Sequence, residues 1–162
     1  MKQHNDTIQK FYTALAAGNY GEMKDLYHPE ARFSDPVFRD LPTREIHAMW
    51  EMLILAGSDL KIVHDGVKTD DNSGSCRWQA WYTFSGTGRM VHNVIYAQFE
   101  FKDGKIFRHN DHFDFWRWSR MALGVSGVVF GWTPFLQSKV RATARKRLAR
   151  FMNKKTTELS KK

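Results

Sequence analysis

The segment FEFKDGKIFRHNDHFDFW, residues 99–116, carries the pattern that decides the fold. Its KDGK turn joins two stretches rich in aromatic and β-branched residues, which predicts a β-hairpin. Side chains alternate along a strand, so the second strand presents two different faces. One face carries Phe107, His109, Asp111, Phe113 and Phe115. Because this face is the more apolar, we expect it to line the core and to place His109 and Asp111 among aromatic rings.

The sequence before this hairpin predicts helices first and strands afterwards. Ile8, Phe11, Tyr12, Leu15 and Ala16 recur at helical spacing, and further helical patterns follow at 21–27 and after Thr43. Alternating segments at 60–67, 75–86 and 89–101 are separated by turn residues. This order predicts an α+β fold, a curved antiparallel sheet packed on N-terminal helices with an extra basic C-terminal helix. We expect one domain, with the sheet unit at 1–118 and a helical extension at 119–162 packed on it.

Composition is consistent with a single soluble domain. The 162 residues are 42% hydrophobic and 14% aromatic, which is enough for a substantial core. Cys76 is the one cysteine, so an internal disulfide is excluded. The N-terminus lacks the apolar core of a secretory signal, and the apolar run at 121–132 is too short and too interrupted to span a bilayer. We therefore expect a cytoplasmic protein.

The positive charge is concentrated at the C-terminus. Residues 139–162 hold ten Lys and Arg against one acid, Glu158, whereas the rest of the chain has a net charge of −1. Leu136, Val140, Ala144, Leu148 and Phe151 or Met152 recur every three or four residues, which predicts an amphipathic helix from about Pro134. Its apolar stripe is expected to pack on the domain as a lid. An anionic membrane surface is the less favoured alternative, and nucleic acid is not expected because the remaining chain is nearly neutral.

Metal, cofactor and nucleophile motifs are not recognisable. The ligand-rich HNDHFD segment sends His109 and Asp111 to one face and His112 and Asp114 to the other, so no three ligands converge. No G-x-S-x-G, P-loop or Rossmann glycine pattern is present. We expect neither a metal nor a cofactor.

Two segments resemble a known superfamily. IQKFYTALAAGNYGEMKDLYHPEARFSDPVF (8–38) and FEFKDGKIFRHNDHFD (99–114) are similar to the opening helices and closing hairpin of nuclear-transport-factor-2-like proteins. These cone-shaped α+β domains include ketosteroid isomerases, limonene-epoxide hydrolases and SnoaL-like polyketide cyclases. The resemblance implies a cone-shaped fold and a small-molecule cavity inside it, and it implies homodimers formed through the convex sheet face, where Trp78, Trp81 and Tyr82 are candidates.

The same resemblance singles out two carboxylates. Asp111 matches the first acid of the hydrolase W-R-D-Y-F-D motif, and Asp35 in FSDPVF matches the isomerase general base. The partner residues differ, since the hydrolase Arg-x-Asp pair falls on Trp78 and Ala80, and the isomerase tyrosine and protonated aspartate fall on Phe11 and Ala97. Each acid also has a purely structural interpretation. Asp35 could cap a turn, and Asp111 could be a buried acid bonded to His109.

The leading hypothesis is that the cone binds a small, largely apolar molecule and performs cofactor-free acid/base chemistry of the isomerase, cyclase or hydratase type. In it, one of the carboxylates of Asp35 and Asp111 is ionised and acts as the base, and the other is protonated or relays a proton through His109, because an apolar surround raises the pKa of a carboxyl group toward neutrality. The alternative is a non-catalytic binding or interaction module, which a cone filled with Trp and Phe would favour. The expected ligand-binding residues are Phe11, Tyr12, Phe33, Trp50, His92, Asn93, Tyr96 and Phe113.

Overall fold

The computed structural model of the chain describes residues 2–160. Its helices are α1 (Lys2–Ala16), α2 (Tyr20–Asp25), α3 (Thr43–Ala56), α4 (Phe115–Leu123), α5 (Val125–Phe130) and α6 (Pro134–Leu159). Its strands are β1 (Tyr27–Ser34), β2 (Leu41–Pro42), β3 (Lys61–Thr69), β4 (Ser73–Phe84), β5 (Arg89–Lys102) and β6 (Lys105–His112). The α+β fold predicted from the sequence is therefore confirmed.

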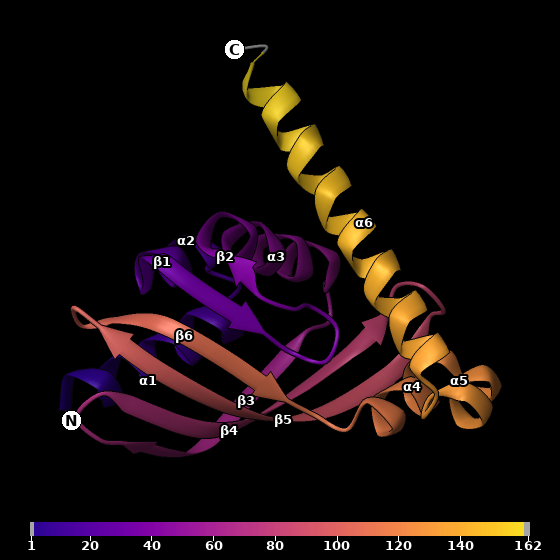
Figure 1. Cartoon of the computed structure of the whole chain (residues 1–162), viewed down its shortest axis with the longest axis horizontal. Helices are drawn as coiled ribbons and strands as arrows, with labels where there is room; N and C mark the ends of the chain where they lie inside the picture. Colours follow the sequence, from indigo (N-terminus) through magenta and orange to yellow (C-terminus); the bar gives the residue numbers. More distant parts are fainter. Residues whose placement is uncertain (1, 161–162) are drawn as a thin grey trace.

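The strands form one curved, unclosed sheet in the order β2-β1-β6-β5-β4-β3 (Figure 1). The pairs from β6 to β3 are antiparallel hairpin neighbours, as the turn signals predict. The pairing of β1 with β6 is parallel, which alternation within single strands could not reveal. It brings Phe33 beside His109, so the N-terminal strand and the closing hairpin meet in the core.

Alternation sorts the long strands into two faces. Inward positions of β4 and β5 are buried, and they include Cys76, Trp78, Asn93, Ile95 and Phe99. On the convex face, Trp81 stacks on His92 with ring centroids 4.4 Å apart. Of the three aromatic residues proposed for a dimer face, Trp81 is thus on the convex surface, whereas Trp78 and Tyr82 occupy inward positions of the same strand.

Two expectations for the closing strand are wrong. The register of β5 and β6 shifts between Glu100 and Phe101, and Phe107 is the extra residue, so the buried position at this end is Ile106. Phe107 instead packs edge-on against His28. The strand also ends at His112, because Asp114 caps the N-terminus of α4 by accepting a hydrogen bond from the Arg117 amide. Phe115 therefore belongs to a helix, and the boundary expected after residue 118 falls inside α4.

Helix α6 begins at Pro134, as its spacing predicts, and lies against α3 before its last turns extend beyond the rest of the domain (Figure 1). Leu148 is buried in the main core, and Ala144, Phe151 and Met152 pack around it. Arg145 forms an ion pair with Glu45 at 2.6 Å, and Lys155 bonds to Glu51. Among residues 2–160, no helix is long and apolar enough to cross a membrane.

The packing of α6 can be tested at its one buried residue. Leu148→Ala should lower the free energy of unfolding by about 2–4 kcal/mol, because it leaves a cavity in the core. Leu159→Ala, at a position 68% exposed on the same helix, should change it by less than about 0.5 kcal/mol. Urea unfolding measures both. Equal effects of the two substitutions would show that α6 does not pack on the domain.

Candidate functional site

A chain of hydrogen bonds crosses the interior of the cone. Trp50 Nε1 donates to Tyr27 Oη at 3.0 Å, and Tyr27 Oη lies 2.7 Å from His109 Nδ1. His109 Nε2 lies 3.0 Å from Asp111 Oδ1, to which Trp78 Nε1 also donates at 3.4 Å. The network links α3, β1, β6 and β4, so it forms only when these elements are assembled.

Aromatic rings enclose this network. The imidazole of His109 is 0% exposed, and Asp111 is 3% exposed. Five rings have centroids 4.4–6.2 Å from the imidazole, those of Phe11, Tyr27, Phe33, Trp50 and Phe99. The sequence prediction that His109 and Asp111 lie among aromatic rings is confirmed, and the space directly around His109 is filled by side chains.

One tautomer of His109 satisfies the whole network. Trp50 can only donate, and the oxygen of Tyr27 accepts from it. Burial holds the pKa of Tyr27 well above its usual range, so its hydroxyl keeps its proton and can donate a hydrogen bond to His109 Nδ1. In the tautomer of His109 that fits this bond, Nε2 carries the ring hydrogen and donates to Asp111, which accepts from Trp78 as well. With that tautomer every link has one donor and one acceptor.

Asp35 lies in the turn after β1, where its surface is partly accessible. Its Oδ1 accepts hydrogen bonds from the amides of Val37 at 2.7 Å and Phe38 at 2.5 Å. The pKa of Asp35 is raised to about 7, first of all by burial. The hydrogen bond from the Phe38 amide opposes the rise, the charge of Asp111 adds to it, and the Val37 amide and Arg141 oppose it. The carboxyl group is therefore poised between its two protonation states at neutral pH.

Apolar groups surround the Asp35 turn. Val37, Tyr82 and Phe113 are half-buried and pack against both the main core and a smaller cluster built on α4, Phe115, Trp118, Ala122 and Val91. Burial raises the pKa of Tyr82, the hydrogen bond from Trp118 lowers it, and the charge of Asp35 raises it, so Asp35 and Tyr82 are close enough to interact. Arg141 of α6 closes the turn by donating to the Pro36 carbonyl oxygen at 2.8 Å. We call this region, Asp35 with Val37, Tyr82 and Phe113, the mouth of the cone.

The expected ligand-binding residues divide between the two sheet faces. Phe11, Tyr12, Phe33, Trp50 and Asn93 are buried on the inner side, and Phe113 is half-buried at the mouth. The prediction that His92 and Tyr96 bind the ligand is wrong, because even-numbered positions of β5 point to the convex face. His92 bonds to Gln79 there, and Tyr96 is 57% exposed. Of the neighbouring pair His92 and Asn93, Asn93 is the inward one.

Three further residues were missed by sequence reasoning. Tyr27 and Tyr82 reach the inner side from strands, and Arg141 reaches the Asp35 turn from a helix more than a hundred residues away. The inward alternation of WQAWYTF at 78–84 could have indicated Tyr82. No feature of the neighbouring sequence indicates the roles of Tyr27 and Arg141, because their hydrogen-bond partners come from distant elements.

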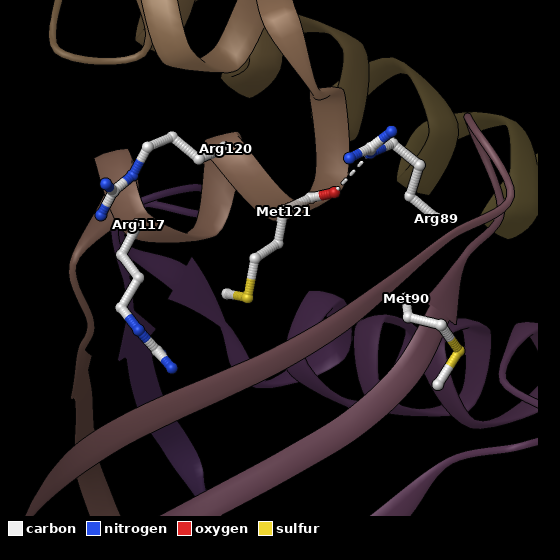
Figure 2. A pocket seen from close by; sticks show the side chains of 5 residues that line it. All are labelled: Arg89, Met90, Arg117, Arg120 and Met121. Carbon is white, nitrogen blue, oxygen red and sulfur yellow. Dashed lines mark hydrogen bonds between the residues drawn. The ribbon is translucent and has the colours of Figure 1, made fainter.

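Two hollows on the surface lie away from both acids. One, of about 610 Å³, is lined by Arg89, Met90, Arg117, Arg120 and Met121, with Arg89 donating to the Met121 carbonyl oxygen (Figure 2). The other, of about 500 Å³, opens on the sheet near Asn110 and Gln98. Within residues 2–160, no three His, Cys, Asp or Glu side chains are grouped to hold a metal ion.

Comparison with known proteins agrees with this architecture. A family model for the SnoaL-like domain matches residues 8–109, so the chain belongs to this family, a branch of the nuclear-transport-factor-2-like (NTF2-like) superfamily. No curated protein matches the sequence.

Solved structures share the fold at low identity. An NTF2-like protein of unknown function from Burkholderia pseudomallei superposes with a TM-score of 0.65 at 14% identity, covering 75% of this chain and 98% of that one. An LEH-like epoxide hydrolase from M. tuberculosis gives 0.63 at 14% identity, covering 79% and 96%. TsrD from Streptomyces laurentii gives 0.65 at 19% identity, covering 76% and 97%. At such identities the likeness establishes the fold alone.

The contribution of the buried network can be measured at Tyr27. Tyr27→Phe removes the donor to His109 and the acceptor of Trp50, so it should lower the free energy of unfolding by about 1–3 kcal/mol. Tyr96→Phe removes an exposed hydroxyl and should change it by less than about 0.5 kcal/mol. Chemical denaturation compares the two. A Tyr27→Phe protein as stable as the Tyr96→Phe control would contradict the network.

Proposed function

We propose that the protein binds a small, largely apolar molecule at the mouth of the cone and exchanges a proton with it through Asp35, without a cofactor. The chemistry is that of an isomerase, cyclase or hydratase. The observation that carries this proposal is the pKa of Asp35, raised to about 7 mainly by burial, at a residue that is partly accessible. A base with this pKa can take a proton at neutral pH and can return it.

The surroundings of Asp35 support this role. Both hydrogen bonds that the Asp35 carboxylate accepts from described residues reach Oδ1, so Oδ2 is available to a bound molecule. Val37, Tyr82 and Phe113 supply apolar surface beside it. The charge of Asp111 raises the pKa of Asp35, because it favours the protonated form of that carboxyl group. In this proposal His109 positions Asp111, and neither residue needs to touch the ligand.

Tyr12 takes no direct part in this proposal. Its hydroxyl is fully buried and lies beside the Cys76 thiol, a weak acceptor for it. Burial, and then the charge of Asp111, hold the pKa of Tyr12 well above its usual range, so the hydroxyl keeps its proton. A ligand at the mouth therefore needs no contact with Tyr12.

A second candidate function is a non-catalytic binding or interaction module. It is favoured by the filled space around His109 and by the structural roles that both acids have, since Asp35 caps its turn and Asp111 pairs with His109. In this case the mouth would hold a ligand or a partner without proton exchange. An assay for proton exchange separates the two candidates.

The assay follows deuterium uptake from D₂O into a panel of apolar cyclic ketones, at the carbon next to the carbonyl. The wild-type protein should accelerate uptake into at least one ketone, and Asp35→Asn should abolish the acceleration, because an amide cannot exchange a proton at neutral pH. Since the base form is required, the protein-dependent rate should fall as the pH drops below about 7. Mass spectrometry measures the uptake.

Asp40→Asn is the matched control, because Asp40 is an exposed acid in the same turn region. It should retain the full rate. Uptake no faster than in buffer with every ketone, or equal rates for wild type and Asp35→Asn, would rule out the acid/base role and leave the binding module.

A further inference from the structure

An apolar surface patch lies at the end of the domain opposite the closing turn of the hairpin. Helix α5 and the segment leading into α6 expose large apolar side chains there, with exposed fractions of 48–80%. We call them the α5 patch, Val125, Val128, Val129, Phe130, Trp132 and Phe135. Single exposed apolar residues are ordinary, whereas a contiguous group of this size indicates an interaction surface.

The packing of α5 turns these side chains outward. Gly127 and Gly131 face α4, where an added Cβ would lie only 1.9 Å from the Ser119 carbonyl oxygen and 2.0 Å from its Oγ, respectively. Ser119 Oγ donates to the Gly127 carbonyl oxygen, and Trp116 Nε1 donates to that of Val128 at 3.2 Å. The small residues thus face the domain and the bulky ones face solvent, in a segment held by defined hydrogen bonds.

The exposed face of α6 continues this surface with positive charge. Phe135, Lys139, Lys146 and Arg150 follow one another at intervals of four, seven and four residues, which places them on one side of the helix. Leu148, the buried residue, is on the opposite side. Among residues 2–160, Lys139, Lys146 and Arg150 take part in no ion pair, in contrast to Arg145 and Lys155 on the packed side.

The positive charge of this surface determines which kind of partner can bind to it. Residues 115–157 contain ten Lys and Arg and no Asp or Glu. A second copy of the chain would bring the same positive charge against itself, which is repulsive. Anionic lipid headgroups are complementary to the lysines and arginine, and aromatic side chains such as Trp132 and Phe135 are suited to the interface between headgroups and acyl chains.

We propose that the protein docks on an anionic lipid bilayer surface, with the α5 patch inserted at the interface and Lys139, Lys146 and Arg150 on the headgroups. The apolar stripe of α6 does not take part, because it is packed against α3 and the core. The contact is peripheral, made by side chains that are already exposed in the folded domain.

Vesicle sedimentation tests the proposal with two kinds of variant. Wild-type protein should bind phosphatidylcholine vesicles containing about 30 mol% phosphatidylglycerol at low ionic strength, and should bind pure phosphatidylcholine far more weakly. Lys139→Glu/Lys146→Glu/Arg150→Glu should reduce partitioning onto the anionic vesicles by about 100-fold or more, since each basic residue near the surface contributes roughly fivefold. Trp132→Ser/Phe135→Ser should reduce it by about tenfold or more.

Matched controls carry the same changes elsewhere on the surface. Lys10→Glu/Arg44→Glu/Lys68→Glu has the same net charge as the first variant, and Leu55→Ser/Val63→Ser removes exposed apolar groups of α3 and β3. Both should bind within about threefold of wild type. Failure of the wild type to bind, or equal losses in variants and controls, would overturn the proposal. So would a wild-type dimer in sedimentation velocity that Trp132→Ser/Phe135→Ser converts to a monomer with no effect on vesicles, because the patch would then be a protein interface.

Discussion

The hydrogen bond between His109 and Asp111, 3.0 Å long and closed off from water, is the interaction on which the interior of this domain depends. A carboxylate in such a place would be costly if it were unpaired, by several kcal/mol. The surrounding elements therefore each supply a partner, Trp78 from β4, Tyr27 from β1 and, one step further, Trp50 from α3. The same network that satisfies the pair also links the N-terminal strand to the closing hairpin, since Tyr27 lies on β1 and His109 on β6.

The charge of Asp111 also acts on Asp35, which lies in a part of the domain that solvent can reach. Asp35 stands at the mouth, and its pKa near 7 comes first from burial and then from Asp111 behind it. Helix α6 adds the last constraint, because Arg141 bonds to the turn of Asp35 while Leu148 anchors the helix in the core. A long basic extension is thereby part of the same structure as the candidate site, and its outer face remains available for a bilayer.

Much of this could be predicted from periodicity. Alternation placed His109 and Asp111 inside, and the three- and four-residue spacing from Pro134 gave α6 its start and its buried stripe. Three features could not be predicted, and each depends on something that periodicity does not record. The bulge at Phe107 places Ile106, and not Phe107, in the buried position of the strand. The partners of Tyr27 are distant in sequence. The apolar run at 121–132 resembles a core segment, and only the contacts of Gly127 and Gly131 show that its bulky residues face outward.

We expect the charge of buried Asp111 to help hold Asp35 at a pKa suited to proton exchange. ¹³C NMR of the aspartate carboxyl carbons, assigned with Asp35→Asn, measures that pKa directly in the wild type and in Asp111→Asn. We expect a titration midpoint of about 7 for Asp35 in the wild type. In Asp111→Asn the pKa should be lower, because a neutral amide no longer opposes ionisation of Asp35. A wild-type pKa of Asp35 in the ordinary range near 4, or one that Asp111→Asn leaves unchanged, would contradict it.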